Sequence, residues 1–461
     1  MKNLIINKIS GRIYLRNIRL VVGLAMVLLL NSCEEFLDLK PTGSIVADNA
    51  ISDAKTARAA VIGGYSQLRS VYQGSINILG TMPADNVLFG ASLTQYTQLD
   101  GNAYSTNNSV SLSAYHGLYS LINRANWVIA DIGKVTDPAL QEAEKNQLLG
   151  EAYFLRAYGY FDLARGWGGV QIQLAPTTDL NAITGIRRSS LTGTYAQAVS
   201  DLRQAEALLP EDNAATRNRA QKAAARALLA RVHLYAGEWE QAETAASAVI
   251  ALDSKFEPVT PFRTYFTSPF LSRESVLELS YSASDQNSSW SGWYCHPRGT
   301  YEYQPTAEII ALLLDPQKAG SRSSLIATAA NGEIYNGQFS AGGLDPQYLI
   351  RIAELYLIRA EARVRKAAPD LPGAVADLNV VRRRAGVTDY AGAVTVADLL
   401  QAIEDERRIE FAFEPHRWYD LVRTERAGVV LGAERQYWLF PLPEADVFAD
   451  PDLGGENNPG Y

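Results

Sequence analysis

The chain has few of the residues that form disulfides and metal sites. Its 461 residues include only two cysteines, Cys33 and Cys295, and four histidines. Cys33 lies where an N-terminal processing signal would end, so we expect no disulfide within the folded chain and a lone thiol at Cys295. No two histidines have the spacing of a zinc motif such as HExxH. The sequence therefore predicts neither a metal site nor a cofactor.

Runs of basic residues are also missing. The 42 lysines and arginines are outnumbered by 50 aspartates and glutamates, which gives a net charge of −8. Nucleic-acid binding requires clustered positive charge against the phosphates, so nucleic acid is excluded as a partner. Hydrophobic residues make up 47% of the chain, which is enough for a large core and excludes a disordered or fibrous protein.

Long apolar runs are confined to the N-terminus. Five basic residues precede the apolar stretch Leu20–Leu30, which is the order of a secretory signal, and the stretch is too short to span a membrane comfortably. Small or polar residues then lead into Cys33, as at the cleavage site of a bacterial lipoprotein. We predict that residues 1–32 are a lipoprotein signal peptide and that Cys33 carries the lipid. An ordinary signal peptide and an uncleaved anchor are the alternatives.

Two acidic residues, Glu34 and Glu35, follow the predicted lipidation site. Acidic residues at this point resemble the surface-export signal of some Gram-negative phyla, and the alternative is a solvated tether. A lipid anchor can hold a protein at a membrane without a spanning helix. We therefore expect an outer-membrane lipoprotein that faces the cell exterior.

Apolar residues at helical spacing dominate the mature chain and predict a mainly α fold. They recur at three- and four-residue steps between Asn146 and Trp167, where a glycine cluster follows. Gln221–Ala236 and Trp239–Leu252 form two helical runs separated by Gly237, which indicates a tetratricopeptide-like hairpin. We expect one domain over residues 33–461. Its helical scaffold is predicted at about residues 50–70, 115–165, 195–252 and 350–425.

A second hairpin is predicted in the C-terminal third. Its helices are expected at Arg351–Arg365 and Ala374–Ala385. A further helix should begin at Thr395, which stands at capping-box spacing from Asp398, and should end or kink before Pro415.

Two long loop-rich segments, at about residues 74–113 and 255–343, lack a helical period, and loops of this length are usually functional. The second segment mixes aromatic with small polar residues, as recognition loops do. Its predicted ligand-binding residues are Trp290, Trp293, Tyr294, Tyr301 and Tyr303. The first segment supplies Asp85, Asn86 and Tyr96. In the alternative interpretation the aromatic residues fill the core or a strand, and the two polar residues form turns.

Two patterns resemble catalytic groups without having their context. The stretch 406–423 is rich in Glu and Arg, but its glutamates lie one helical turn apart with arginines in reach, which favours a structural ion network over a catalytic carboxylate pair. The same interpretation applies to Arg351, Glu354 and Arg382. Cys295 adjoins His296, but sequence adjacency alone does not make an activated dyad. We predict that the protein is not an enzyme.

Motifs along nearly the whole mature chain share the pattern of one family. In the N-terminal half they are Phe36-Leu37-Asp38, Gly64-Tyr65, Glu151-Ala152-Tyr153-Phe154-Leu155-Arg156-Ala157 and Gly168-Gly169-Val170. In the C-terminal third they are Arg351-Ile352-Ala353-Glu354-Leu355-Tyr356-Leu357, Leu378-Asn379-Val380-Val381-Arg382-Arg383-Arg384-Ala385-Gly386, Glu406-Arg407-Arg408, Arg417-Trp418-Tyr419-Asp420-Leu421 and Asn458-Pro459-Gly460-Tyr461. With them the chain resembles the SusD/RagB family, the lipoprotein half of outer-membrane nutrient uptake pairs. It departs from the family at Ala449-Asp450-Pro451, where Asn-Pro is common.

The resemblance implies an α-helical fold with tetratricopeptide-like hairpins, a loop-rich face that binds ligand, and a SusC-like TonB-dependent transporter as partner. The function that follows is capture of a polymeric nutrient, an oligosaccharide or polysaccharide, and its delivery to that transporter. Three other hypotheses remain: the same scaffold binding peptides, a surface glycoside hydrolase, and a helical-repeat scaffold without a ligand.

Overall fold

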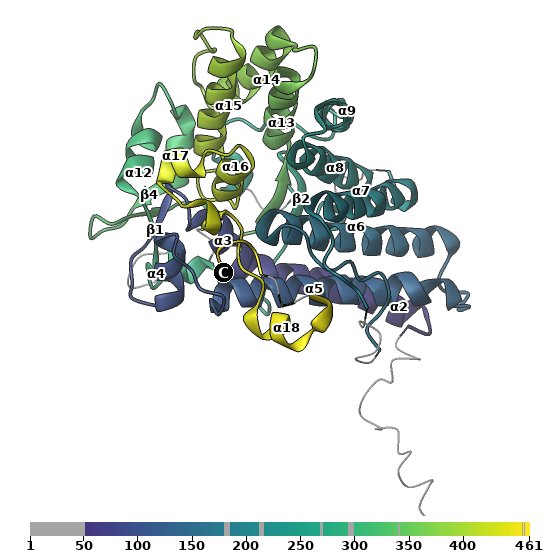
Figure 1. Ribbon diagram of the computed structural model, residues 1–461. Coiled ribbons are helices and arrows are strands. Elements are labelled where there is room, and N and C mark those ends of the chain that lie inside the picture. Colours follow the sequence, from purple (N-terminus) through teal and green to yellow (C-terminus); the bar gives the residue numbers. More distant parts are fainter. Residues whose placement is uncertain are drawn as a thin grey trace, which may run out of the picture. The chain divides into compact units, whose positions relative to one another are not determined.

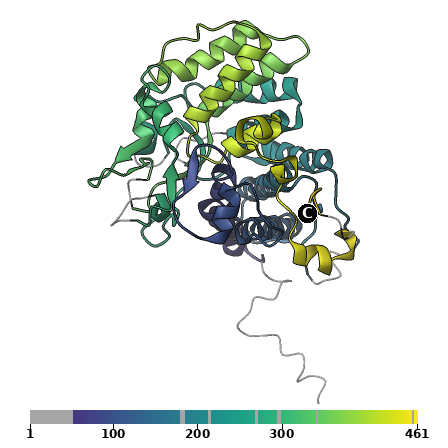
Figure 2. The ribbon, with the colours of Figure 1, turned by 60° about the vertical axis from the view of Figure 1, so that its left-hand side comes forward.

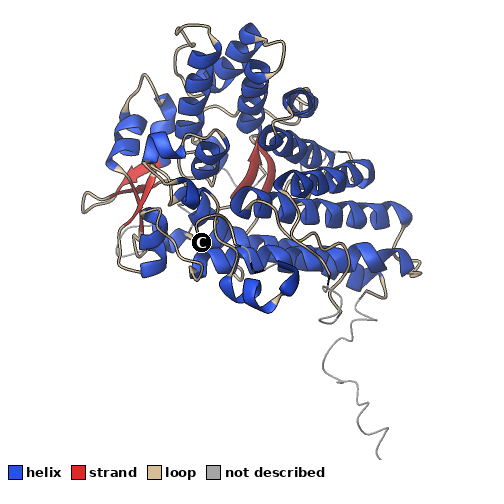
Figure 3. Ribbon diagram, viewed as in Figure 1, coloured by secondary structure: helices blue, strands red, loops and turns tan. Residues whose placement is uncertain are grey.

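The structure is a computed structural model, and helices make up most of it (Figure 3). It describes residues 51–178, 185–211, 216–267, 271–293, 299–339, 342–453, 455 and 457–461. The segment Ile51–Tyr461 forms one compact unit. The predicted signal peptide and Cys33 lie outside the described residues, as do Cys295 and His296. The predicted mainly α fold is confirmed.

Long helices that pack against one another form the scaffold, which Figure 1 shows from α2 and α5 at the bottom to α14 and α15 at the top. Helices that follow one another in the chain pack together, and α13 packs against α9. The scaffold helices are α2 (Ala54–Val71), α5 (Ser109–Asp131), α6 (Glu142–Trp167), α7 (Leu191–Leu208), α8 (Lys222–Ala236), α9 (Trp239–Ile250), α13 (Ile352–Arg365), α14 (Leu371–Arg384) and α15 (Val396–Glu410).

Local sequence signals explain where several of these helices begin and end. Helix α8 ends at Gly237, whose φ of +75° is the left-handed conformation that glycine adopts without strain. Helix α15 begins after Thr395, whose hydroxyl accepts a hydrogen bond from the backbone N–H of Asp398 at 3.3 Å, and it ends before Pro415. Both predictions are confirmed.

The start of α14 differs from the prediction. The helix begins at Leu371, three residues before Ala374, because the side chain of Asp370 caps it by accepting a hydrogen bond from the N–H of Gly373 at 2.9 Å. Pro372 is compatible with this position, since the first-turn N–H groups of a helix have no helical partner.

A glycine of α6 lies directly against α5. A Cβ atom at Gly159 of α6 would lie 2.8 Å from Cγ1 of Ile122 of α5. This separation is shorter than any relaxed contact between two carbon atoms. Any larger residue at position 159 would therefore displace the buried Ile122 side chain.

Short elements occupy the remaining segments and lie mostly at the left of Figure 1, which Figure 2 turns toward the viewer. Three antiparallel strand pairs are present among the described residues: β1 (Val87–Phe89) with β3 (Tyr303–Pro305), β2 (Ser275–Leu279) with β6 (Gln347–Arg351), and β4 (Ile326–Thr328) with β5 (Ile334–Asn336). The short helices here are α3 (Asn77–Thr81), α4 (Thr94–Asp100), α10 (Thr264–Thr267), α11 (Trp290–Trp293) and α12 (Ala307–Leu314). The C-terminal segment adds α16 (Arg417–Arg423), α17 (Ala427–Leu431) and α18 (Glu444–Ala449).

Candidate functional site

The two loop-rich segments meet at the strand pair β1–β3. Val87 lies opposite Pro305 and Phe89 opposite Tyr303 in an antiparallel register. A further backbone hydrogen bond of 2.8 Å, from the N–H of Gly90 to the carbonyl of Glu302, continues the pairing beyond β1. Residues 87–96 and 301–305, more than 200 positions apart in the chain, therefore form one region, which we call the loop face.

An aromatic cluster joins the elements of the loop face. We define it as Phe89, Tyr96, Trp293, Tyr303 and Phe339. Ring centroids are 4.9 Å apart for Phe89 and Tyr96, 6.1 Å for Tyr96 and Tyr303, and 5.5 Å for Trp293 and Tyr303. These distances are typical of favourable aromatic pairs. Three of the predicted ligand-binding residues, Tyr96, Trp293 and Tyr303, thus lie together, while Phe89 and Phe339 had no distinctive sequence signal.

The members of the cluster differ in exposure, and this decides what they can contact. Trp293 is 2% exposed and Tyr303 is 9% exposed. The ring of Trp293 stacks on Phe339, with 6.3 Å between centroids, and also contacts Phe413. A buried ring offers no face to a ligand in this conformation, so Trp293 and Tyr303 have the core-filling role that was the alternative to binding. Tyr96 is half-buried and lies at the edge of the cluster.

Tyr301 lies next to the cluster and is half-buried. Its hydroxyl donates a hydrogen bond of 2.6 Å to the carbonyl of Ile334 in β5. Its backbone has a φ of +53°, a left-handed conformation that is uncommon outside glycine and costs free energy unless the surroundings hold it. Tyr301 therefore connects β3 to the β4–β5 hairpin.

Asp85 and Asn86 are anchored away from solvent. The carboxylate of Asp85 forms ion pairs with Arg417 at 2.8 Å and with Arg408 at 3.1 Å. Burial acts to raise the pKa of Asp85, but the two guanidinium groups outweigh it and lower the pKa below its usual value. The buried amide of Asn86 donates to the carbonyls of Arg408 and Ala412 and accepts from the Arg408 guanidinium at 2.9 Å. Their polar atoms fasten β1 to α15 and α16 and are not free for a ligand.

Two predicted residues are not placed by the structure. Trp290 begins α11, but its side chain is outside the described part of the chain, and Tyr294 lies outside it entirely. Their roles in binding stay predictions.

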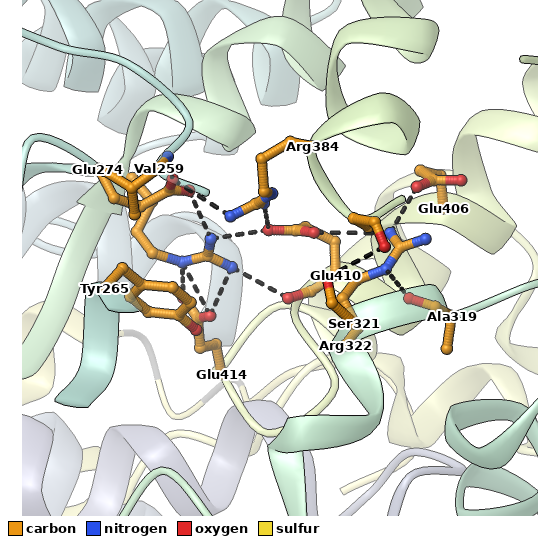
Figure 4. A network of polar contacts seen from close by, with 12 residues as sticks. Val259, Tyr265, Glu274, Ala319, Ser321, Arg322, Arg384, Glu406, Glu410 and Glu414 are labelled. Atoms are coloured by element: carbon orange, nitrogen blue, oxygen red, sulfur yellow. Dashed lines mark hydrogen bonds and ion pairs between the residues drawn. The ribbon is translucent and has the colours of Figure 1, made fainter. Parts of the chain in front are cut away.

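A buried network of charges accounts for the conspicuous glutamates and arginines (Figure 4). Arg351 lies at its centre and forms ion pairs with Glu274 at 2.9 Å, with Glu410 at 2.7 Å and with Glu414 at 2.7 Å. Arg384 pairs with Glu274 and Glu410, and Arg322 lies 3.5 Å from Glu410. Most of these ion pairs join residues of different elements, whereas the sequence suggested pairs between glutamates and arginines close together along one helix.

The environment of these carboxylates fits a structural role. Glu274 and Glu410 are fully buried, and Glu414 is nearly so. Burial raises the pKa of Glu414, although Arg351 opposes it; for Glu410, burial acts in the same direction, but Arg384 and Arg351 outweigh it and lower the pKa. A catalytic carboxyl must reach its substrate, whereas these three carboxylates are buried and paired with arginine side chains. The predicted structural network is therefore present.

Neither metal ligation nor membrane spanning is indicated by the described residues. Within them, no three His, Cys, Asp or Glu side chains gather closely enough to hold a metal ion. In the same residues, every helix falls short of the length and apolar character needed to cross a bilayer.

The fold and the loop face define a helical-repeat scaffold that carries an irregular surface made by two inserted segments. Two family models match the chain: one described as starch-binding and associating with the outer membrane matches residues 35–234, and the SusD family model matches residues 329–438. Together they cover about two thirds of the sequence. The chain belongs to the SusD/RagB family, whose members are outer-membrane-associated nutrient-binding proteins.

Individual relatives can be aligned with this chain over nearly their full length. SusD-like protein P2 of Formosa agariphila is 25% identical, over 96% of this chain and 99% of its own. A SusD superfamily protein of Bacteroides vulgatus has a TM-score of 0.77 at 21% identity, covering 89% of this chain and 99% of its own. A structure described as a laminarin-binding SusD-like protein has a TM-score of 0.75 at 22% identity, covering 89% and 100%. At these identities the two structures are similar in fold.

Proposed function

We propose that this protein is a lipoprotein of the outer membrane that binds an oligosaccharide on its loop face and delivers it to a SusC-like TonB-dependent transporter. The observation that carries the proposal is the meeting of two long inserted segments at β1–β3, with Tyr96 and Tyr301 half-exposed beside it. Membership of a family described as starch-binding, and a similar fold in a laminarin-binding protein, support a glycan as the ligand.

The loop face combines exposed contact groups with a rigid base. Residues 90–93, between β1 and α4, are exposed, and the Leu93 side chain is 45% exposed. Sugar rings bind by laying their C–H faces on aromatic and apolar side chains, which Tyr96, Tyr301 and Leu93 can supply. The buried ring of Tyr303 packs against Tyr96, and the Tyr301 hydroxyl is bonded to Ile334, so these two side chains lose less ordering entropy on binding. A polymer that engages such a surface repeatedly gains affinity from its effective concentration.

The first test of the loop face replaces Tyr96 by alanine. Loss of the ring is expected to weaken oligosaccharide binding about tenfold, which corresponds to about 1.4 kcal/mol. Tyr96→Phe should bind nearly as well as the wild type, because it keeps the ring. The measurement is isothermal titration with starch and laminarin oligosaccharides. Phe448→Ala is the matched control, since Phe448 is an aromatic residue that is 81% exposed and lies on α18, outside the loop face.

Three results would contradict this assignment. Unchanged saccharide binding by Tyr96→Ala, with circular dichroism like that of the wild type, would remove the loop face as the site. Binding of a peptide panel in place of the saccharide panel would support the peptide-binding hypothesis. Hydrolysis of a bound saccharide that stops on Glu410→Gln substitution would support the hydrolase.

The membrane anchor has a separate test. Mass spectrometry of the mature protein from a bacterial host is expected to show an N-terminal peptide that begins at a diacylglycerol-modified Cys33. Cys33→Ala should move the protein out of the membrane fraction, because the acyl chains provide the attachment. A Cys33→Ala protein that stays with the membrane would overturn the lipoprotein assignment. Co-purification of the tagged protein with a β-barrel transporter from the native host tests the partner.

A further inference from the structure

The strand pair of the loop face turns alternate side chains to opposite sides. Phe89 of β1 and Tyr303 of β3 lie opposite each other, and both are buried in the aromatic cluster. The residues that follow them, Gly90 and Gln304, are exposed and half-buried, respectively. Successive side chains of a strand point to opposite faces. Gly90 and Gln304 therefore lie on the outer side of the pair, as diagonal neighbours across the two strands.

Glycine at position 90 leaves room for the side chain of Gln304. A Cβ atom at Gly90 would lie 2.1 Å from Nε2 and 2.5 Å from Cδ of Gln304, which is far shorter than a relaxed contact. The Gln304 amide therefore lies directly on the Gly90 backbone. From this place its Nε2 donates a hydrogen bond of 3.1 Å to the carbonyl of Tyr301. A glycine of the first inserted segment thus decides where an amide of the second segment can reach.

Tyr301 has a backbone conformation that needs such support. Its φ of +53° lies in the left-handed region, which costs free energy for residues other than glycine. Among the described residues, four that are not glycine have a positive φ, and Tyr301 is the only aromatic one of them: Asn102, Leu271, Tyr301 and Glu425. A tight turn alone could be made with glycine. Strained conformations of larger residues persist where the surroundings hold them, and they cluster at functional sites.

Hydrogen bonds hold Tyr301 at both ends. Its hydroxyl donates to the carbonyl of Ile334 in β5 at 2.6 Å, and its backbone carbonyl accepts from the Gln304 amide. Together these bonds fix the backbone and the ring, while the residue stays half-buried at the loop face. Without the Gln304 amide, the backbone of Tyr301 can relax out of the left-handed region and carry the ring with it. Only the molecules that keep the ring in place would then bind, and the apparent affinity falls by that fraction.

We propose that Gln304 is a positioning residue of the loop face. Its amide, seated on Gly90, holds Tyr301 in the left-handed conformation in which the ring can contact a sugar. This role rests on the proposed function, which supplies the ligand, and Gln304 acts on that ligand through Tyr301. The binding surface is therefore organised before the saccharide arrives, because one amide of β3 and one glycine after β1 fix a strained tyrosine between them.

Two substitutions displace the same amide by different routes. Gln304→Met keeps the length of the side chain but removes the donor, and Gly90→Ala pushes the amide away from Tyr301 with its new Cβ atom. Each is expected to weaken the binding of laminarihexaose or maltohexaose about fivefold in isothermal titration. The double variant should lose no more than either single variant, because both remove one contact. Gly133→Ala is the matched control, since Gly133 is exposed and a Cβ atom there would meet nothing within 4 Å.

A Tyr301→Ala background separates positioning from a general structural role. With no ring left to hold, Gln304→Met and Gly90→Ala should cause no further loss of affinity. A residue that merely kept β1 paired with β3 would weaken binding in this background too, because it would also displace Tyr96, which packs against Tyr303. Further loss in the Tyr301→Ala background, or additive losses in the double variant, would therefore contradict the positioning role.

The remaining outcomes separate this role from the proposed function. Unchanged binding by Gln304→Met and by Gly90→Ala, with weaker binding by Tyr96→Ala, would overturn the role of Gln304 and leave the loop face as the site. Unchanged binding by all three variants would overturn the loop face itself, and the positioning role with it.

Discussion

Replacement of Arg351 by methionine is expected to lower the free energy of unfolding by about 3–5 kcal/mol, which is the cost of removing one partner from a buried ion network. Arg351 is 1% exposed and holds Glu274, Glu410 and Glu414. Arg384 still pairs with Glu274 and Glu410 in the variant, but Glu414 has no other ion pair among the described residues. Its carboxylate would be left in a buried site without a counter-charge.

The effect should be measured by urea unfolding followed by circular dichroism, with Arg383→Met as the control. Arg383 is an arginine of α14 whose side chain is 66% exposed and pairs only with Asp389 among the described residues. Its substitution should leave the unfolding midpoint unchanged. Equal midpoints for Arg351→Met and the wild type would contradict the structural role of the network.

Loss of the Glu361 charge is expected to change how stability depends on pH. Glu361 is buried and accepts two hydrogen bonds of 2.8 Å from Arg423, and another of 2.8 Å from Arg365. Burial acts to raise its pKa, but Arg423 and then Arg365 outweigh it and lower the pKa from 4.5 to about 2. A carboxyl that titrates lower in the folded than in the unfolded chain stabilises the fold when ionised. This difference corresponds to about 3 kcal/mol.

The stabilisation by Glu361 should be fully present above pH 4.5, decrease as the pH falls, and be lost below about pH 2. Glu361→Gln should therefore be less stable than the wild type by about 3 kcal/mol at pH 7, and the gap should narrow progressively below pH 4.5. Urea unfolding at several pH values between 7 and 3 measures it. Glu240→Gln, a change at an exposed glutamate of α9, should run parallel to the wild type at each pH. A constant gap for Glu361→Gln would argue against an ionised, buried Glu361.

The helical scaffold was accessible from sequence because its signals are local. Apolar residues recur at helical spacing, Gly237 ends α8, and Thr395 with Asp398 begins α15. Each of these features acts within one or two turns of the chain. The early start of α14 was missed, although its signal is also local: Asp370 stands at the capping position before Pro372. Pro372 and Gly373 follow directly, and because both residue types are common in turns they obscured the cap.

The loop face shows why the sequence could not separate ligand-binding residues from core-filling residues. Composition identified an aromatic-rich segment, but a tryptophan that binds a ligand and one that fills a core have the same local sequence context. The burial of Trp293 depends on its contacts with Phe339 and Phe413. Phe413 lies more than 100 residues away along the chain, so only the folded structure brings the two rings together. The local sequence around Asp85 is likewise compatible with a ligand-binding residue or a turn residue. In the structure its carboxylate accepts a hydrogen bond from Arg417, which lies 332 positions away.

The sequence alone determined the fold class, the family resemblance and the structural nature of the Glu- and Arg-rich stretch, because helix periodicity, capping and motif spacing are encoded over short distances. Tertiary structure alone decided which aromatic rings are buried and which arginine neutralises which carboxylate. These contacts join segments separated by tens to hundreds of residues, and their free energy depends on burial and distance that exist only once the chain has folded.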